Sequence, residues 1–312
     1  MAHPRRFRFG LKFRAAEDGA SLAALAQRAE ALGYSTILVS DHPTHPQLAP
    51  LTAAAALACA TSRLRIGSSV LANDFRHPVV LAKEVATLDL ISGGRVEIGI
   101  GTGWKKAEYE AMGLAFDLAS QRIERLREAI GILRAFWSGK PDAFAGKHYA
   151  IGEITGFPTP VQARLPILIG GGGKKVLSLA AETADIVGIN PAARSGAHDL
   201  ETDLDSTADA TDEKLRWIAE AAGARMDDLE LCMQVYADCL TQSRAEGDRA
   251  LAARYAFPLE QARRVPYAWV GSVDEICAGL DEKRARWGVS YWVVPEHAME
   301  TMAPVVERMT GR

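Results

Sequence analysis

Apolar and polar residues alternate at the start of the chain. Between residues 7 and 13, phenylalanine and leucine alternate with arginine, glycine and lysine, which is the period-two pattern of a strand. Apolar residues then recur at helical spacing over 22–32, preceded by Ser21 as a predicted helix cap and followed by Gly33 as a predicted stop. A short β-rich run at 35–40 follows. This order predicts a βαβ unit.

The same rhythm continues along the chain. Helical spacing predicts further helices at 50–62, 78–91, 123–137 and 176–183. Apolar runs predict further strands at 64–71, 95–101, 165–170, 185–189, 229–237 and 289–294. Strictly alternating strands and helices indicate a parallel sheet, and eight such strands close naturally into a barrel. We therefore expect an α/β fold, a (β/α)8 TIM barrel forming a single domain over 1–312, with a doubly wound open sheet as the alternative.

Two segments interrupt this rhythm. Residues 141–156 are rich in glycine and aromatic residues, which favours a surface hairpin or excursion. A second excursion is expected at about 195–213, where residues 199–213 hold seven acidic residues and no basic one. That composition is typical of a mobile, solvated loop with an attached helix start. Long loops of this kind on barrels also serve as active-site lids.

Composition and net charge exclude several classes of function. With 312 residues, 48% hydrophobic and 24% charged, the chain can bury a substantial core. Its net charge of -3 creates no positive field for nucleic acid or anionic lipid. No run approaches 18 apolar residues, and the N-terminal stretch lacks the apolar core of a signal peptide, so we expect a cytoplasmic protein. The four cysteines form no C-x-x-C pair and are interpreted as structural thiols.

Polar and glycine-rich segments follow four predicted strands. Because the active site of a barrel lies at the carboxyl ends of its strands, these segments are the candidate site. They lie at 41–43, 73–78, 101–104 and 170–175.

The four glycines Gly170, Gly171, Gly172 and Gly173 immediately precede a predicted helix. Glycines permit close approach of a ligand to the backbone, and free amides at a helix N-terminus bind anions such as phosphate. Lys174 or Lys175 would add positive charge. Glycine-rich turns without any ligand are also common, so both interpretations stay open.

Asp41 and His42 form the second candidate group. The histidine titrates near neutrality, and a neighbouring carboxylate would support its charged form, as a proton donor requires. The alternative is a helix-capping aspartate beside a packing histidine. His42 and His45 lack a second pair of ligands, so no metal site is expected. The chain also lacks the G-x-S-x-G elbow of hydrolases and any Walker motif.

Together these segments resemble the luciferase-like monooxygenase superfamily, and within it the branch predicted to use the deazaflavin coenzyme F420. The resemblance extends from Phe7 to about Pro295, and SGGR followed by a G-x-G-x-G-W segment is its most specific part. The motifs that carry it are SDH at 40–42, VLANDFRHP at 70–78, LAKEVATLDLISGGRVEIGIGTGWKKAEYEAMG at 81–113, PILIGGGG at 166–173 and GVSYWVV at 288–294.

The resemblance implies a cofactor ring across the barrel mouth. Ser69, Val70 and Leu71 would form the bulge behind the ring, which in this family often contains a non-prolyl cis peptide. Gly101 and Thr102 would lie beside the cofactor, and the glycine run at 170–173 would accommodate its ribityl chain and phosphate. His42 matches the active-site histidine of deazaflavin-dependent sugar-phosphate and alcohol dehydrogenases, with Asp41 beside it.

One position departs from those sugar-phosphate dehydrogenases. They carry a glutamate proton donor where this chain has Trp104, so their reaction is not carried over. Trp104 either lines the substrate pocket or only packs.

The resemblance favours F420-dependent hydride transfer to or from a small organic substrate. The first alternative is an FMNH2-dependent monooxygenase that inserts one oxygen atom from O2, and the second is a non-catalytic flavin-binding barrel. A metal-dependent barrel hydrolase is a non-redox alternative. The resemblance also implies a homodimer and a separate flavin or F420 reductase as partner, with no nucleic-acid or membrane partner.

Overall fold

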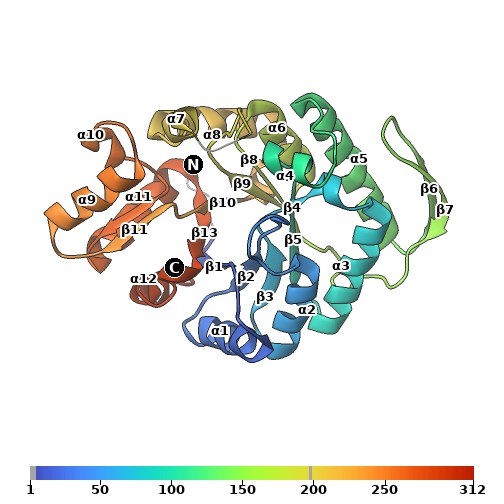
Figure 1. Ribbon diagram of the computed structural model, residues 1–312, viewed down its shortest axis with the longest axis horizontal. Helices are drawn as coiled ribbons and strands as arrows, with labels where there is room; N and C mark the ends of the chain where they lie inside the picture. The colour runs from blue at the N-terminus through green and yellow to red at the C-terminus, as the bar shows by residue number, and fades with distance from the viewer. Residues whose placement is uncertain (1–4, 197–198) are drawn as a thin grey trace.

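Eight parallel strands form a closed barrel in the computed structural model, which describes residues 5–196 and 199–312 (Figure 1). Each strand pairs with its neighbours, and pairing of β3 with β5 closes the ring. The predicted (β/α)8 barrel is therefore confirmed. The barrel strands are β1 (Arg8–Phe13), β2 (Thr36–Val39), β3 (Arg65–Ser68), β5 (Val96–Gly101), β8 (Ile167–Gly171), β9 (Ile186–Ile189), β10 (Glu230–Gln234) and β13 (Val289–Pro295).

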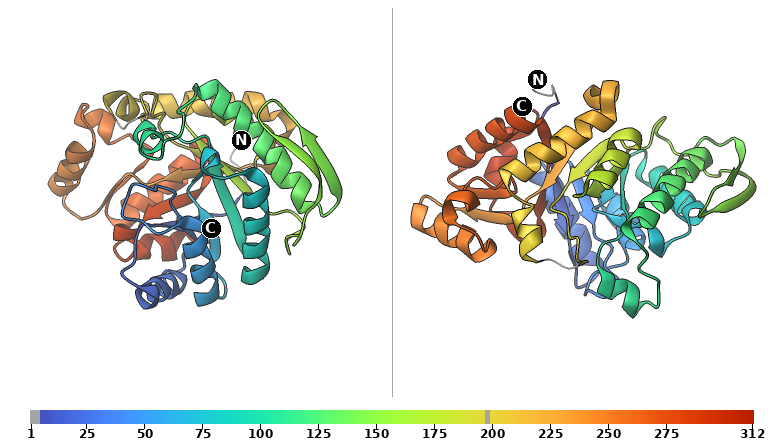
Figure 2. Two further views of the ribbon diagram at one scale, coloured as in Figure 1. Left: turned by 45° about the vertical axis from the view of Figure 1, so that its right-hand side comes forward. Right: turned by 90° about the horizontal axis from the view of Figure 1, so that it is seen from above.

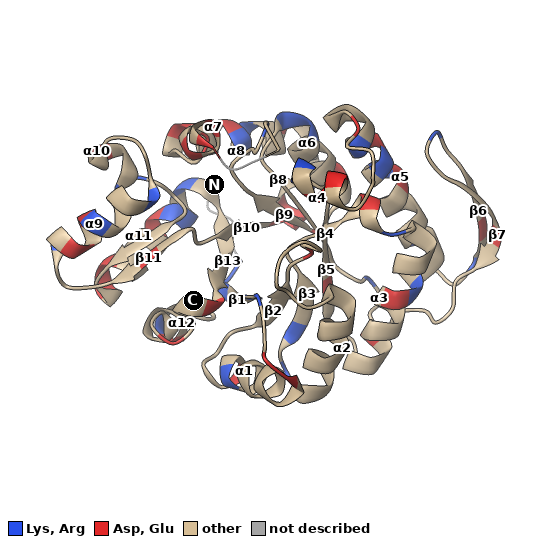
Figure 3. Ribbon diagram, in the orientation of Figure 1, with Lys and Arg blue, Asp and Glu red and all other residues tan. Residues whose placement is uncertain are grey.

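Helices surround the barrel on its outer side (Figures 1 and 2). The longer ones are α1 (Gly19–Ala31), α2 (Pro50–Ala60), α3 (Pro78–Ser92), α5 (Ala119–Trp137), α6 (Lys174–Thr183), α8 (Ala208–Ala222), α9 (Arg244–Arg254) and α11 (Val273–Trp287). The shorter ones are α4 (Lys106–Ala111), α7 (Leu200–Leu204), α10 (Leu259–Ala262) and α12 (Ala303–Met309). Acidic and basic residues are interspersed over these helices (Figure 3), and none of the helices in the described part is long and apolar enough to span a membrane.

The alternation in β1 separates two environments. Its phenylalanines and leucine pack into the layer between the strands and the helices, where Phe9 meets Trp269 edge to face. Its polar face points into the barrel, where the Arg8 guanidinium lies over the Tyr291 ring. Gly10 lies on the same face of the strand. A side chain would not fit there, because a Cβ atom would lie 2.9 Å from the Tyr291 hydroxyl. The polar face of this strand is thus inside the barrel.

A buried ion network fills the amino-terminal end of the barrel. The Glu97 carboxylate, with a side chain only 2% exposed, accepts hydrogen bonds from Arg8 at 2.8 Å and Arg65 at 3.1 Å. The Tyr291 hydroxyl donates to its other oxygen at 2.7 Å, and Arg8 also pairs with Glu230 at 2.6 Å. Burial alone would raise the pKa of Glu97, but Arg8 and Arg65 hold it below its usual value. Each buried charge therefore has a partner.

The start of α1 differs from the prediction. Asp18 is the N-cap, and its carboxylate accepts a hydrogen bond from the Ser21 amide at 2.8 Å. Ser21 stands three residues further on and returns a bond from the Asp18 amide to its hydroxyl at 3.0 Å. The predicted Ser21 cap was therefore wrong, because the two residues form a reciprocal capping box whose first member is the aspartate.

Two predicted strands are shorter than expected. The strand predicted at 64–71 ends at Ser68, and after the cis peptide bond between Ser69 and Val70 the chain resumes as the short strand β4 (Leu71–Ala72). The strand predicted at 229–237 ends at Gln234. Beyond it, β11 (Ala237–Leu240) leaves the barrel and pairs in parallel with β12 (Ala268–Gly271). The apolar pattern of the sequence continues past Gln234 into β11, which is itself partly apolar. The pattern therefore does not mark the point at which the chain leaves the barrel.

Residues 141–156 contain an antiparallel hairpin made of β6 (Pro141–Ala145) and β7 (Ala150–Thr155). The hairpin stands away from the barrel beside α5 (Figures 1 and 2). At its turn, the Glu128 carboxylate of α5 accepts hydrogen bonds from three consecutive backbone amides, at 147–149. These bonds attach the hairpin to the barrel.

The acidic segment at 199–213 is not a solvated loop, so that part of the prediction was wrong, whereas the predicted helix start within it is present. It forms α7 and the start of α8, and Asp199 caps α7. Asp203 and Asp205 pair with Arg254 at 2.8 Å and with the fully buried Lys214 at 2.6 Å. Lys214 and Arg254, which lie outside the segment, neutralise these two carboxylates and allow them to be largely buried. Residues 197 and 198 of the excursion expected at 195–213 lie outside the described residues.

Candidate active site

A cavity of about 880 Å³ opens at the carboxyl ends of the barrel strands. Every site residue predicted from the sequence contributes to its lining. These residues are Asp41, His42, Ser69, Val70, Leu71, Gly101, Thr102, Trp104, Gly170, Gly171, Gly172, Gly173 and Lys174. The fold thus brings the candidate segments into one cavity, while the roles assigned to the individual residues stay predictions.

His42 contacts a buried carboxylate at the mouth of the barrel. Its Nδ1 lies 3.0 Å and 3.1 Å from the two carboxylate oxygens of Glu108, whose side chain is only 3% exposed. Thr44 donates a further hydrogen bond to this carboxylate at 3.3 Å. Because an ionised carboxylate only accepts, Nδ1 carries the proton and Nε2 is the unprotonated nitrogen of the neutral ring. The pair can therefore accept a proton at Nε2.

Burial lowers the pKa of His42 below its ordinary value, although the adjacent Glu108 acts in the opposite direction. The positive charge of Lys12 lowers it further. The imidazole is therefore neutral near pH 7, which is the form that a general base requires.

Asp41 does not orient His42, so that part of the prediction was wrong. Its carboxylate accepts hydrogen bonds from Arg76 at 2.6 Å and 3.0 Å and from the Ala72 amide at 3.0 Å. These contacts join the end of β2 to the segment after β4. Asp41 thus holds the two loops together, and its negative charge is satisfied by the guanidinium.

Sequence reasoning missed Glu108. It lies in a charged stretch of α4, where the nearby Glu110 is exposed and pairs with Lys106 at 3.3 Å. Nothing in the local pattern separates the two glutamates. Only the packing of α4 over the barrel mouth, 66 positions away from His42 in sequence, buries one and leaves the other in solvent.

Val70 forms a wall of the cavity, and glycines pack against it. A Cβ atom at Gly101 would lie 2.9 Å from one Val70 methyl group, and one at Gly170 would lie 3.3 Å from the other. The Ser69–Val70 peptide bond is cis, as the family resemblance implied. The absence of side chains at these two glycines keeps the cavity surface beside Val70 open.

The glycine run ends at the N-terminus of α6. A Cβ atom at Gly172 would come within 2.5 Å of the Ala192 amide, so this glycine permits close packing of the loop after β9. Gly173 is the N-cap, and a Cβ atom there would meet no atom within 4 Å. The Lys174 ammonium lies 3.7 Å from Glu220 of α8, so part of its charge is already neutralised. No side chain caps this helix start, so the prediction that its backbone amides bind a phosphate stays a prediction.

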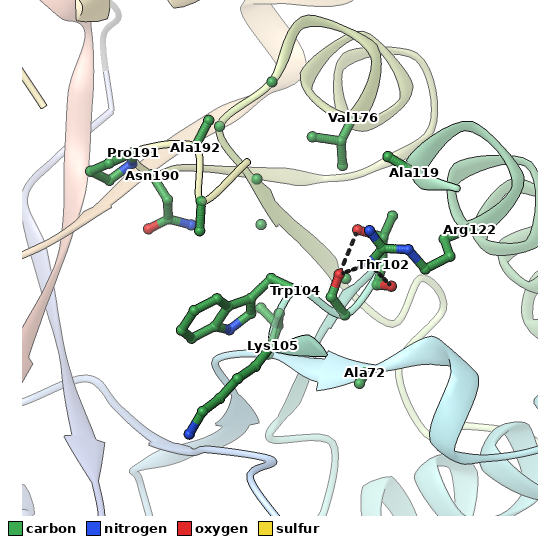
Figure 4. Close-up of a pocket in the computed structure, with 18 of the residues that line it drawn as sticks. Ala72, Thr102, Trp104, Lys105, Ala119, Arg122, Val176, Asn190, Pro191 and Ala192 are labelled. Atoms are coloured by element: carbon green, nitrogen blue, oxygen red, sulfur yellow. Dashed lines mark hydrogen bonds between the residues drawn. The ribbon is translucent and has the colours of Figure 1, made fainter. Parts of the chain in front are cut away.

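The loop after β5 is fixed by an arginine from α5. Arg122 donates hydrogen bonds to the carbonyl oxygens of Thr102, at 3.3 Å, and Gly103 (Figure 4). Trp104 follows, 42% exposed, with its ring edge-on to the His42 ring at 6.1 Å between centroids. The tryptophan is thus held beside His42 at the cavity entrance.

The cavity lining also includes polar residues that sequence reasoning missed, among them Asn190, Gln234 and Tyr236. The Tyr236 hydroxyl donates to the Asn190 side-chain oxygen at 2.9 Å. The Gln234 amide donates to the Ser69 hydroxyl at 3.0 Å. Both pairs join residues far apart in the chain, and neither lies in a glycine-rich or charged motif that would have indicated it.

The model of the family described as luciferase-like monooxygenase matches residues 6–305. The chain belongs to this family. An F420-dependent glucose-6-phosphate dehydrogenase from Nakamurella multipartita is 31% identical over 92% of this chain and 84% of its own length.

Two solved structures share the fold of this chain at low sequence identity. The F420-dependent tetrahydromethanopterin reductase from Methanopyrus kandleri has a TM-score of 0.79 at 20% identity, over 98% of this chain and all of that one. A monooxygenase from Streptomyces bottropensis has a TM-score of 0.71 at 22% identity, over 97% of both chains. These structures support the fold, and the family model and the F420-dependent relatives confirm the resemblance drawn from the sequence motifs.

Proposed function

We propose that this protein is an F420-dependent oxidoreductase that transfers a hydride between the deazaflavin and a small organic substrate. The observation that carries the proposal is a single cavity joining the His42–Glu108 pair, the Val70 wall and the free helix start at Gly173. The relatives named as F420-dependent dehydrogenases support the choice of cofactor.

The residues present fit a deazaflavin mononucleotide-like group. The glycines at 101 and 170 leave space for a planar ring beside Val70, and the open space at Gly173 leaves the amides of α6 accessible to a phosphate. When bound, F420 supplies a two-electron hydride donor or acceptor. The protein itself provides orientation and the proton.

His42 would handle that proton. Its neutral Nε2 accepts a proton from a substrate hydroxyl as hydride leaves carbon, and the charged ring returns one in the reverse direction. The Glu108 carboxylate at 3.0 Å stabilises the imidazolium that forms. Asp41 supports the loop carrying His42 through its bonds to Arg76.

Glucose 6-phosphate is not carried over from the relatives, because Trp104 occupies the position where the sugar-phosphate dehydrogenases have a glutamate proton donor. Trp104 would instead line the substrate pocket. We further propose a homodimer that receives reduced cofactor from a separate reductase, on the family resemblance alone. A cytoplasmic location is proposed on the apolar pattern of the sequence.

Titration of the purified protein with F420 and with FMN, each oxidised and reduced, tests the proposal through cofactor fluorescence and tryptophan quenching. Micromolar F420 binding with much weaker FMN binding is expected. Preferential FMN binding would overturn the deazaflavin assignment and favour oxygen insertion. Binding of F420 without turnover across a panel of alcohols, imines, enones and quinones would favour a non-catalytic barrel.

Gly173→Val is expected to weaken F420 binding roughly tenfold, about 1.4 kcal/mol. Thermal stability should fall only slightly, because valine is a poorer N-cap residue than glycine. The new side chain enters open space at the helix start, so it meets no protein atom but occupies the volume next to the amides. The measurement is the F420 dissociation constant together with the melting temperature.

Gly152→Val is the matched control, because Gly152 also faces open space but lies on the hairpin strand β7. Its F420 affinity should equal that of the unchanged protein. Equal affinities for both variants would show that the Gly173 helix start does not hold the cofactor.

A further inference from the structure

Asn190 is the first residue after β9, and it lines the cavity (Figure 4). Its backbone amide donates to the Gly171 carbonyl at 2.9 Å, which continues the pairing of β9 with β8 beyond the end of the strand. Pro191 follows, and a proline restricts the backbone of the residue before it. The base of the Asn190 side chain is therefore fixed beside the glycine run.

The Tyr236 hydroxyl determines which end of the Asn190 amide enters the cavity. It donates to Asn190 Oδ1 at 2.9 Å, so the amide nitrogen is turned away from the phenol. Tyr236 is itself held in place, because its backbone amide donates to the Tyr267 carbonyl at 2.9 Å and the two rings pack with centroids 5.4 Å apart. The amide oxygen of Asn190 is thus satisfied within the protein.

The amide nitrogen of Asn190 is a donor without an acceptor. Over the described ranges 5–196 and 199–312, no oxygen of the protein lies within hydrogen-bonding distance of Nδ2. A Cβ atom at Gly170 would lie 3.4 Å from this nitrogen and 3.3 Å from a Val70 methyl group. The nitrogen therefore lies next to the wall that is proposed to contact the cofactor ring. Its hydrogens are available to an acceptor on a bound molecule.

We propose that Asn190 binds the cofactor ring, with Nδ2 donating a hydrogen bond to a ring carbonyl oxygen, and that Tyr236 is the positioning residue that keeps Nδ2 in the cavity. The proposal rests on the function proposed above and adds two residues that the sequence motifs do not indicate. Flavins and deazaflavins both have carbonyl oxygens on the pyrimidine part of the ring, so either ring offers the acceptor. Hydrogen bonds to the ring are one way in which a protein adjusts the reactivity of such a cofactor.

The surroundings of Nδ2 favour a ring carbonyl over a phosphate as the acceptor. The amide is neutral, and the groups beside it are the Val70 side chain and the backbone of Gly170. The proposed phosphate site lies further along the glycine run, at the start of α6, where Lys174 and Lys175 line the cavity. A neutral donor beside an apolar wall suits the uncharged edge of a planar ring.

Asn190→Asp tests the proposal. Aspartate has almost the same shape and still accepts the Tyr236 hydrogen bond, so the loop should keep its structure, but an ionised carboxylate cannot donate. The dissociation constant of oxidised F420 should rise about tenfold or more. Infrared difference spectra of bound F420 should show a ring carbonyl stretch at higher wavenumber than in the unchanged protein, because the carbonyl loses its hydrogen bond.

Tyr236→Phe and Tyr149→Phe form a matched pair. Without the Tyr236 hydroxyl the Asn190 amide can rotate, so the dissociation constant of F420 should rise about three- to fivefold, with the same direction of carbonyl shift. Tyr149→Phe also removes a phenol that is hydrogen-bonded to an asparagine, Asn73, at 3.2 Å, but these two residues lie outside the cavity lining. Tyr149→Phe should change neither the affinity nor the carbonyl stretch.

The two proposals can fail separately. If the unchanged protein binds F420 and Asn190→Asp binds it equally well, the Asn190 assignment is wrong and the proposed function stands. If the protein binds FMN but not F420, and Asn190→Asp weakens FMN binding with a carbonyl shift, the reverse holds. Weaker binding without a carbonyl shift, or equal losses in Asn190→Asp and Tyr149→Phe, would also overturn the Asn190 assignment. Binding of neither ring would overturn both proposals.

Discussion

His42→Gln is expected to lower kcat about a hundredfold or more while the F420 dissociation constant changes only a few-fold. Glutamine keeps a polar side chain of similar reach but cannot take up a proton, so general acid–base catalysis worth about 10²–10⁴-fold is lost. The neutral imidazole beside Glu108 is the group that the geometry places for this task. Steady-state kinetics and cofactor titration of the same preparation measure both quantities.

Two glutamates on α4 provide the companion test. Glu108→Gln removes the carboxylate that stabilises the charged imidazole and should lower kcat about tenfold. Glu110→Gln, on the same helix but with an exposed carboxylate, should leave kcat unchanged. Full activity of both His42→Gln and Glu108→Gln would remove this pair from the mechanism.

Glu97→Gln is expected to lower the free energy of unfolding by about 3–5 kcal/mol. The substitution removes one partner of a buried network and leaves the Arg8 and Arg65 guanidinium groups inside the barrel without their shared carboxylate. The hydrogen bond from the Tyr291 hydroxyl also loses its charged acceptor. Urea denaturation followed by circular dichroism measures the change.

Glu300→Gln is the control for that measurement. It breaks a pair with Arg28 of similar geometry, 2.7 Å, in which both side chains are about half exposed. Solvent screens an exposed pair of this kind, so its loss should change the free energy of unfolding far less than the loss of Glu97 does. If the two variants lose the same free energy of unfolding, burial of the barrel network is not what makes it stabilising.

The alternation of apolar residues was sufficient to predict the barrel. Residues on the buried face of a strand or helix are mostly apolar, so they recur along the sequence with the period of that element, as in β1 and α5. The predicted secondary structure was wrong where a segment contacts residues that are distant in the sequence. The segment at 199–213 was predicted to be solvated, because its partners Lys214 and Arg254 lie outside it. The strand predicted at 229–237 ends at Gln234, where the chain leaves the barrel for β11 and its pairing with β12.

Prediction of the candidate site from the sequence also succeeded only in part. The sequence was enough to predict the segments that line the cavity, because the carboxyl ends of parallel strands meet at one end of a barrel and glycine marks close backbone approach. Which charged groups contact each other depends on the tertiary structure. It pairs His42 with Glu108 and Asp41 with Arg76. Electrostatic interaction depends on distance and burial, and neither is encoded in the spacing of residues along a chain.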